Sequence, residues 1–89
     1  MNITSSKQFV EEACKAVFEM AKQGLDPTDH VEFTLDDVYV VNSSYILGNQ
    51  KAQLSTTLPD GKYYEVTYNV SAGEMYVDMY VKIGQNIIK

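Results

Sequence analysis

The first apolar positions of the chain recur at intervals of three and four, the spacing of one face of an α-helix. These positions are Phe9, Val10, Ala13, Cys14, Val17, Phe18 and Ala21. Ser5 and Gln8 have the spacing of a capping box, in which Ser5 accepts from an orphan amide and Gln8 reaches back. Gly24, with Pro27 shortly behind it, is typical of a helix end. The pattern predicts a helix over residues 6–23.

Beyond residue 36 the chain becomes dense in β-branched and aromatic residues, which favour strands. Turn signals divide this part at Gly48-Asn49, Pro59-Asp60-Gly61 and Ser71-Ala72-Gly73. The predicted strands are 36–47, 50–58, 62–69 and 74–83. Links this short join only antiparallel neighbours. We therefore expect a single α+β domain over residues 1–89, in which one N-terminal helix packs on a four-stranded antiparallel β-meander; residues 84–89 are too few to assign.

The hairpin around Pro59 could adopt either of two registers. A two-residue loop at Asp60 and Gly61 would place Leu54 opposite Thr67, an apolar residue against a polar one. A type I turn with Gly61 as a left-handed bulge residue instead places Leu54 opposite Val66 and gives one coherent apolar face. The second register is expected. Its further pairs are Leu58 with Lys62, Tyr64 with Thr56, and Tyr68 with Ala52.

A four-residue loop at 70–73 extends the pattern to the last strand and places Val66 opposite Val77, Tyr64 opposite Met79 and Tyr68 opposite Met75. One face of the sheet, on which the helix can lie, is then expected to carry Leu54, Val66, Val77, Met79 and Val81. The opposite face is expected to carry Tyr63, Glu65, Thr67, Tyr76, Asp78 and Tyr80.

The first long strand is also apolar on both sides. Val38, Val40 and Ile46 alternate with Tyr39, Val41 and Tyr45. A strand of this kind usually belongs to a sheet that is covered on both faces. One helix covers only one face, so the second face is left for another partner.

The face with Tyr63, Tyr76 and Tyr80 is the main functional candidate. Tyrosine combines a large apolar body with a polar tip and is enriched in interface cores, although ordinary solvent-facing strands also favour it. We interpret the face as an interface with another protein or with a second copy, as in a homodimer. Glu65, Asp78 and Thr67 complete the predicted interface residues.

Glu65 and Asp78 are expected to lie directly opposite each other, and opposed like charges destabilise a sheet. Either the register of the last hairpin is off by two, or Lys82, a cation or a shared proton relieves the repulsion. Paired carboxylates can also perform acid–base chemistry when one pKa is raised. The alternative function is therefore a small-ligand-binding protein or enzyme, with a pocket at a helix–sheet or dimer seam that uses this pair.

Other chemistry finds little support in the sequence. The acidic segment 26–30, which ends in the single histidine His30, lacks the spacing of a calcium-binding loop. Cys14 lies on the apolar face of the helix, where a buried structural thiol is expected. No phosphate-binding loop or nucleophile elbow occurs. We predict no enzyme activity, no metal and no cofactor.

Charge and hydropathy argue against two classes of partner, nucleic acids and membranes. Twelve acidic residues against seven lysines, with no arginine, give a net charge of −5. Affinity for nucleic acid depends on clusters of cations, so no nucleic-acid partner is expected. The longest apolar runs are far shorter than the roughly 20 residues of a membrane helix, and the N-terminus lacks the pattern of a signal peptide. We expect a cytoplasmic protein with no membrane contact.

Three stretches, "LDDVYVV", "KAQLSTTLPDGKYYEVTYN" and "YVDMYVK", resemble a family of small uncharacterised proteins from bacteriophages and prophages of Gram-positive bacteria. The resemblance extends from the "KQFVEEACK" helix over most of the chain, and the "LSTTLPDGKYYEVTYN" hairpin is its most specific part. The family carries a tryptophan shortly after the "VV" of the first long strand, where this sequence has Asn42. The resemblance brings no catalytic residues, and it implies a phage accessory protein that acts in the host cytoplasm.

Overall fold

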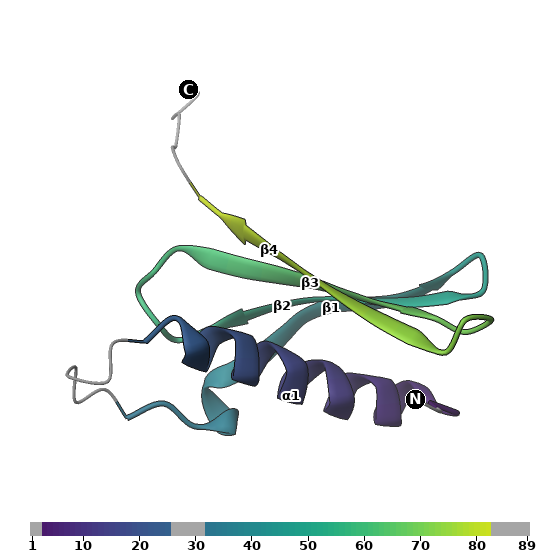
Figure 1. Ribbon diagram of the computed structural model, residues 1–89, viewed down its shortest axis with the longest axis horizontal. Coiled ribbons are helices and arrows are strands. Elements are labelled where there is room, and N and C mark those ends of the chain that lie inside the picture. The colour runs from purple at the N-terminus through teal and green to yellow at the C-terminus, as the bar shows by residue number, and fades with distance from the viewer. Residues whose placement is uncertain (1–2, 26–31, 83–89) are drawn as a thin grey trace.

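The computed structural model describes residues 3–25 and 32–82, and within them the chain forms one helix on a four-stranded antiparallel sheet. The elements are α1 (Ser6–Gln23), the short 3₁₀ turn η1 (Leu35–Asp37), β1 (Val38–Ile46), β2 (Asn49–Thr56), β3 (Lys62–Asn69) and β4 (Glu74–Val81). The strands lie in the order β1-β2-β3-β4, and α1 runs along the sheet on one side (Figure 1). The expected α+β fold is confirmed.

Helix α1 begins where the capping pattern predicts, with one difference in detail. The Oγ of Ser5 accepts a hydrogen bond from the backbone N–H of Gln8 at 3.1 Å. The Gln8 side chain reaches back one residue further than a capping box requires, and its Oε1 accepts from the backbone N–H of Thr4 at 3.0 Å. Both bonds satisfy amides near the helix start, which have no partner within the helix.

The core lies between α1 and the sheet face that it covers, here named the inner face. Helix residues Phe9, Ala13, Val17 and Ala21 are buried against it, at the predicted three- and four-residue spacing. The sheet contributes Val38, Ala52, Leu54, Tyr64, Val66 and Tyr68, all buried. Burial of each large apolar side chain contributes about 1.5–3 kcal/mol. These contacts are the main source of stability for a chain of this size.

The register between β2 and β3 differs from the predicted one by two residues. Leu54 lies opposite Tyr64 rather than Val66, and Tyr68 lies opposite Gln50 rather than Ala52. A shift of two leaves every side chain on its original face. The predicted apolar face is therefore preserved although its cross-strand partners are different.

The longer loop at 57–61 explains the shift. Gly61 has the predicted left-handed backbone, with φ of 68°, but Leu58 lies in the loop and does not pair with Lys62. The Oγ1 of Thr56 accepts from the N–H of Leu58 at 3.2 Å. The Oδ1 of Asp60 accepts from the N–H of Lys62 at 3.0 Å. These local bonds satisfy loop amides that a tighter hairpin would pair across the strands.

Strand β1 departs from the predicted alternation because it contains a β-bulge between Val40 and Asn42. An extra residue in one strand moves every later side chain to the other face. Tyr45 therefore joins the inner face, where it lies opposite Gln50, and Ile46 joins the other face. The alternation in the sequence predicts the opposite arrangement, with Ile46 on the inner face and Tyr45 on the outer face.

The ends of β1 are also shorter than predicted. Asp36 and Asp37 belong to η1, where the Oδ2 of Asp37 accepts from the N–H of Thr34 at 2.9 Å. Leu47 and Gly48 form a two-residue turn with φ of 52° and 80°, the left-handed pair of a type I′ hairpin. The β3–β4 hairpin has the predicted register, with Val66 opposite Val77 and a loop at 70–73. Residues 26–30 and 83–89 lie outside the described residues.

Replacement of Gly61 tests the loop. Gly61→Ala is expected to lower the free energy of unfolding by about 1–2 kcal/mol, because left-handed backbone is unfavourable for a residue with a Cβ. An added Cβ would meet only Lys82 atoms at 3.9 Å, an ordinary contact. Gly24→Ala is the matched control, since Gly24 has φ of −82° and should not lose stability. Equal effects in urea unfolding would contradict the left-handed assignment.

Tyr64 offers a second test, because its buried hydroxyl has no hydrogen-bond partner within the described part of the chain. An unsatisfied buried hydroxyl costs about 1–3 kcal/mol, so Tyr64→Phe is expected to raise the free energy of unfolding by about 1 kcal/mol. Urea unfolding at neutral pH measures the difference. A clear loss of stability would indicate that the hydroxyl has a partner.

The same variant should change how the free energy of unfolding depends on pH in alkaline solution. Burial, with a smaller contribution from the charge of Asp60, raises the pKa of Tyr64 above its ordinary value of 10.0. The folded state therefore holds this proton more tightly than the unfolded chain, so the free energy of unfolding falls as the pH rises above about 10. Tyr64→Phe should lose less stability than the wild type between neutral pH and pH values above 10. Equal losses of stability in the variant and the wild type would contradict the raised pKa of Tyr64.

Candidate interaction face

The sheet face that turns away from α1, here named the outer face, carries all six residues that the sequence placed there. They are Tyr63, Glu65 and Thr67 from β3 and Tyr76, Asp78 and Tyr80 from β4. The pairing places Tyr63 opposite Tyr80, Glu65 opposite Asp78 and Thr67 opposite Tyr76. No described element covers this face (Figure 1).

Tyr63 and Tyr80 stack on each other across the two strands. Their ring centroids are 5.0 Å apart and the ring planes differ by 13°. The two side chains remain 46% and 41% exposed, respectively. Stacking of this kind contributes about 0.5–1.5 kcal/mol beyond the area that it buries. It also fixes the rings, so that a partner binding there would pay little entropy to order them.

Tyr76 is tied to its own strand by a hydrogen bond, since its hydroxyl donates to the Oε2 of Glu74. That bond and the nearby carboxylate charge raise the pKa of Tyr76. The phenol therefore stays protonated at neutral pH. Tyr76 is about half exposed. Its ring adds a third tyrosine to the surface formed by the stacked pair.

Glu65 and Asp78 lie directly opposite each other, as the sequence predicted. A counter-charge comes from a residue that the sequence did not indicate: the Nζ of Lys51 is 3.5 Å from the Oε1 of Glu65. The observed register places Lys51 opposite Thr67, diagonal to Glu65. In the predicted register Lys51 lies two positions further from Glu65, so the sequence does not indicate this ion pair. Both side chains of the pair are partly exposed, so the attraction is screened and modest.

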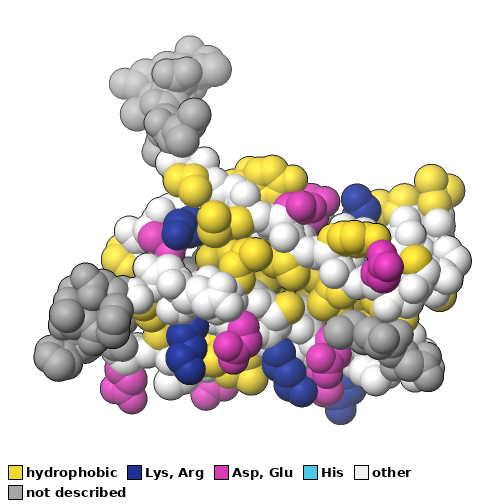
Figure 2. Space-filling view, viewed as in Figure 1, with side chains coloured by type: hydrophobic (Ala, Val, Ile, Leu, Met, Phe, Trp, Pro, Cys, Tyr) yellow, Lys and Arg dark blue, Asp and Glu magenta, His cyan; other side chains and the backbone are white. Residues whose placement is uncertain are grey.

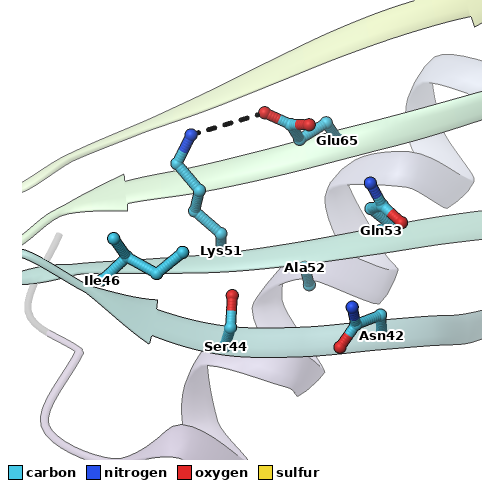
Figure 3. Close-up of a pocket in the computed structure, with 7 residues that line it drawn as sticks. All are labelled: Asn42, Ser44, Ile46, Lys51, Ala52, Gln53 and Glu65. Atoms are coloured by element: carbon cyan, nitrogen blue, oxygen red, sulfur yellow. Dashed lines mark ion pairs between the residues drawn. The ribbon is translucent and has the colours of Figure 1, made fainter.

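The outer face continues over β2 and β1, where the bulge turns Ile46 outward. Tyr39, Val41 and Ile46 are all exposed there. Beside them is an open hollow of about 240 Å³ lined by Asn42, Ser44, Ile46, Lys51, Ala52, Gln53 and Glu65. Figure 3 shows the ion pair between Lys51 and Glu65 at its rim. The bulge has no clear sequence signal, so the outward position of Ile46 was not predicted, whereas Tyr39 lies on the side that the alternation indicates.

A second hollow, of about 250 Å³, opens between α1 and the strands β1 and β2. Its lining residues are Ser6, Phe9, Val10, Ser43, Ser44, Tyr45 and Gln50. Glu65 and Asp78 project from the other side of the sheet. This hollow between helix and sheet therefore does not include the carboxylate pair, and a pocket at a dimer seam is the form of the alternative hypothesis that would use it.

The remaining candidate groups lack reactive surroundings. Cys14 is half-buried on the core side of α1, and burial raises the pKa of its thiol, which favours the unreactive protonated form. Among residues 3–25 and 32–82, no three histidine, cysteine or acidic side chains are grouped as a metal site requires. No helix in the same residues has the length and apolar character needed to span a bilayer.

Comparison with known proteins identifies the family of the chain. Neither the curated proteins nor the solved structures match the chain. A family model described as a family of unknown function, DUF6275, matches residues 10–89, which include most of α1 and the whole sheet. The chain therefore belongs to this family of unknown function, DUF6275.

Proposed function

We propose that the protein is a small phage-type accessory protein that acts by binding another protein through its outer face. The observation that carries the proposal is the exposed, stacked pair Tyr63–Tyr80 on a sheet face with no covering element among the described residues. Exposed aromatic residues of this kind form the energetic centre of many protein interfaces. The phage origin rests on the sequence resemblance given above.

The arrangement of charge around the tyrosines supports the same function. Glu65 and Asp78 lie beside the stacked pair on neighbouring strand positions, and the chain has a net charge of −5. Rim charges of one sign favour partners that present cations, and they speed association with such partners. A host enzyme or a defence component in the bacterial cytoplasm, with a basic patch around an apolar centre, would be a suitable target.

Small-ligand binding has weaker support. Pockets for small ligands usually enclose about 300–1,000 Å³ and bury most of the ligand. The hollow beside Glu65 measures about 240 Å³ and is open to solvent. The hollow beneath the helix holds no carboxylate. Neither site provides a nucleophile next to a base, and we propose no catalytic function.

Loss of the tyrosine pair tests the proposal. Partners captured by the tagged wild-type protein from infected host cells should be lost when Tyr63→Ala and Tyr80→Ala are combined, because the anchor residues at the centre of the face are removed. Quantitative mass spectrometry of the captured proteins, followed by direct binding with each purified candidate, measures the loss.

Tyr45→Ala is the matched control, since Tyr45 is an exposed tyrosine of the inner face and its removal should leave binding unchanged. Melting curves of both variants establish that they remain folded. Binding that survives removal of both outer-face tyrosines would rule out this face as the interaction site.

A further inference from the structure

The edge strand β4 lacks several of the features by which sheet edges usually avoid pairing with other chains, although it carries the charges of Glu74 and Asp78 on its outer face. Such edges carry proline, bulges or inward-pointing charges. β4 pairs with β3 without a bulge, it contains no proline, and its inner-face positions are all apolar. The other edge strand, β1, has a bulge near its middle. The two edges of the sheet are thus built differently.

Among residues 3–25 and 32–82, no strand pairs with the outer edge of the β4 backbone. The N–H of Lys82 donates to the carbonyl of Gly61 at 3.0 Å, in line with the pairing of Val81 with Lys62. In an antiparallel ladder such hydrogen-bonded positions alternate along the strand. The N–H and C=O groups of Met75, Val77, Met79 and Val81 therefore point away from β3. In the described part of the chain no further strand lies beyond β4.

The inner-face side chains of the same residues are only partly covered. α1 packs mainly on β1, β2 and β3, and Met79 and Val81 remain 47% and 49% exposed. Figure 2 shows hydrophobic side chains gathered in a band between β4 and α1. Met75 and Val77 are half-buried beside them. An edge that exposes both its backbone groups and an apolar flank is suited to pairing with another strand.

We propose that a second copy of the chain occupies this edge, with the two β4 strands antiparallel about a two-fold axis at Val77. The strand is self-complementary in this register. Met75 lies opposite Met79 of the second copy on the inner face. On the outer face Tyr76 lies opposite Asp78 of the second copy, and Glu74 opposite its Tyr80. No carboxylate then faces another carboxylate. The hydroxyl of Tyr80 can donate to Glu74 of the second copy, while that of Tyr76 keeps its bond to Glu74 of its own strand.

Charge excludes the neighbouring register. A two-fold axis at Asp78 would pair an equal length of the strand, but it would place the two Asp78 carboxylates directly opposite each other, which destabilises a sheet. α1 does not obstruct the pairing, since it lies over the other strands. The resulting dimer has one continuous sheet in which the two outer faces adjoin. The inference goes beyond the proposed function and does not depend on it.

The oligomeric state of the full chain tests the proposal. Size-exclusion chromatography with light scattering should give the mass of a dimer for the wild type. Met79→Lys, which places a charge on the apolar flank, should give a monomer at concentrations where the wild type is dimeric. Tyr45→Lys is the matched control, because Tyr45 is exposed on the inner face of the opposite edge strand, and it should remain a dimer. A monomeric wild type, or a dimer that survives Met79→Lys, overturns the proposal.

A cysteine at the proposed axis tests the register. Two Cα atoms opposite each other in a hydrogen-bonded pair are about 5.5 Å apart, within the range that a disulfide spans. Val77→Cys should therefore form a covalent dimer under mild oxidation, whereas the wild type, with only the half-buried Cys14, should not. No cross-link from Val77→Cys would overturn the register. Met79→Lys retains Tyr63 and Tyr80, so its capture of partners reports on the proposed function separately from dimerisation.

Discussion

The packing of one amphipathic helix on one face of a four-stranded sheet is the constraint from which the rest of the structure follows. A sheet with apolar or aromatic residues on both faces needs two covering layers, and the described chain supplies one. α1 buries Leu54, Tyr64 and Val66 on the inner face almost completely. Tyr63 and Tyr80, on alternate positions of the same strands, remain about half exposed. Exposure of the outer face thus follows from the single helix that the described part of the chain supplies.

The helix is also too narrow to cover the whole inner face. It leaves the inner-face side chains of β4 partly exposed. The apolar flank of β4 lies at the same edge as the backbone groups that no described strand pairs with, whereas the tyrosines lie on the outer face. The two surfaces would be satisfied by different partners, a second copy at the edge and another protein on the face. Pairing of two copies would also bring two tyrosine faces together. Avidity could then strengthen the binding of a partner with two matching sites.

The fold could be predicted because its main signals are local and repetitive. The three- and four-residue spacing from Phe9 to Ala21 fixed the helix face, and alternation fixed which tyrosines lie on which side of β3 and β4. Register was harder, since a shift of two residues preserves every face; hydrogen bonds of Thr56 and Asp60 within the loop decided it. The bulge near Val41 and the position of Lys51 beside Glu65 depend on cross-strand geometry, which periodicity does not contain. The identity of a partner lies beyond what any of these local patterns encodes.

Residue-level hydroxyl-radical footprinting, read by mass spectrometry, tests most directly the claim that one face of the sheet is covered and the other bare. In dilute solution the account predicts strong labelling of Tyr63, Tyr76 and Tyr80 and protection of Tyr64 and Tyr68, although Tyr63 and Tyr64 are neighbours in the sequence. Protection of the outer-face tyrosines in the isolated chain, or equal labelling of Tyr63 and Tyr64, would contradict it.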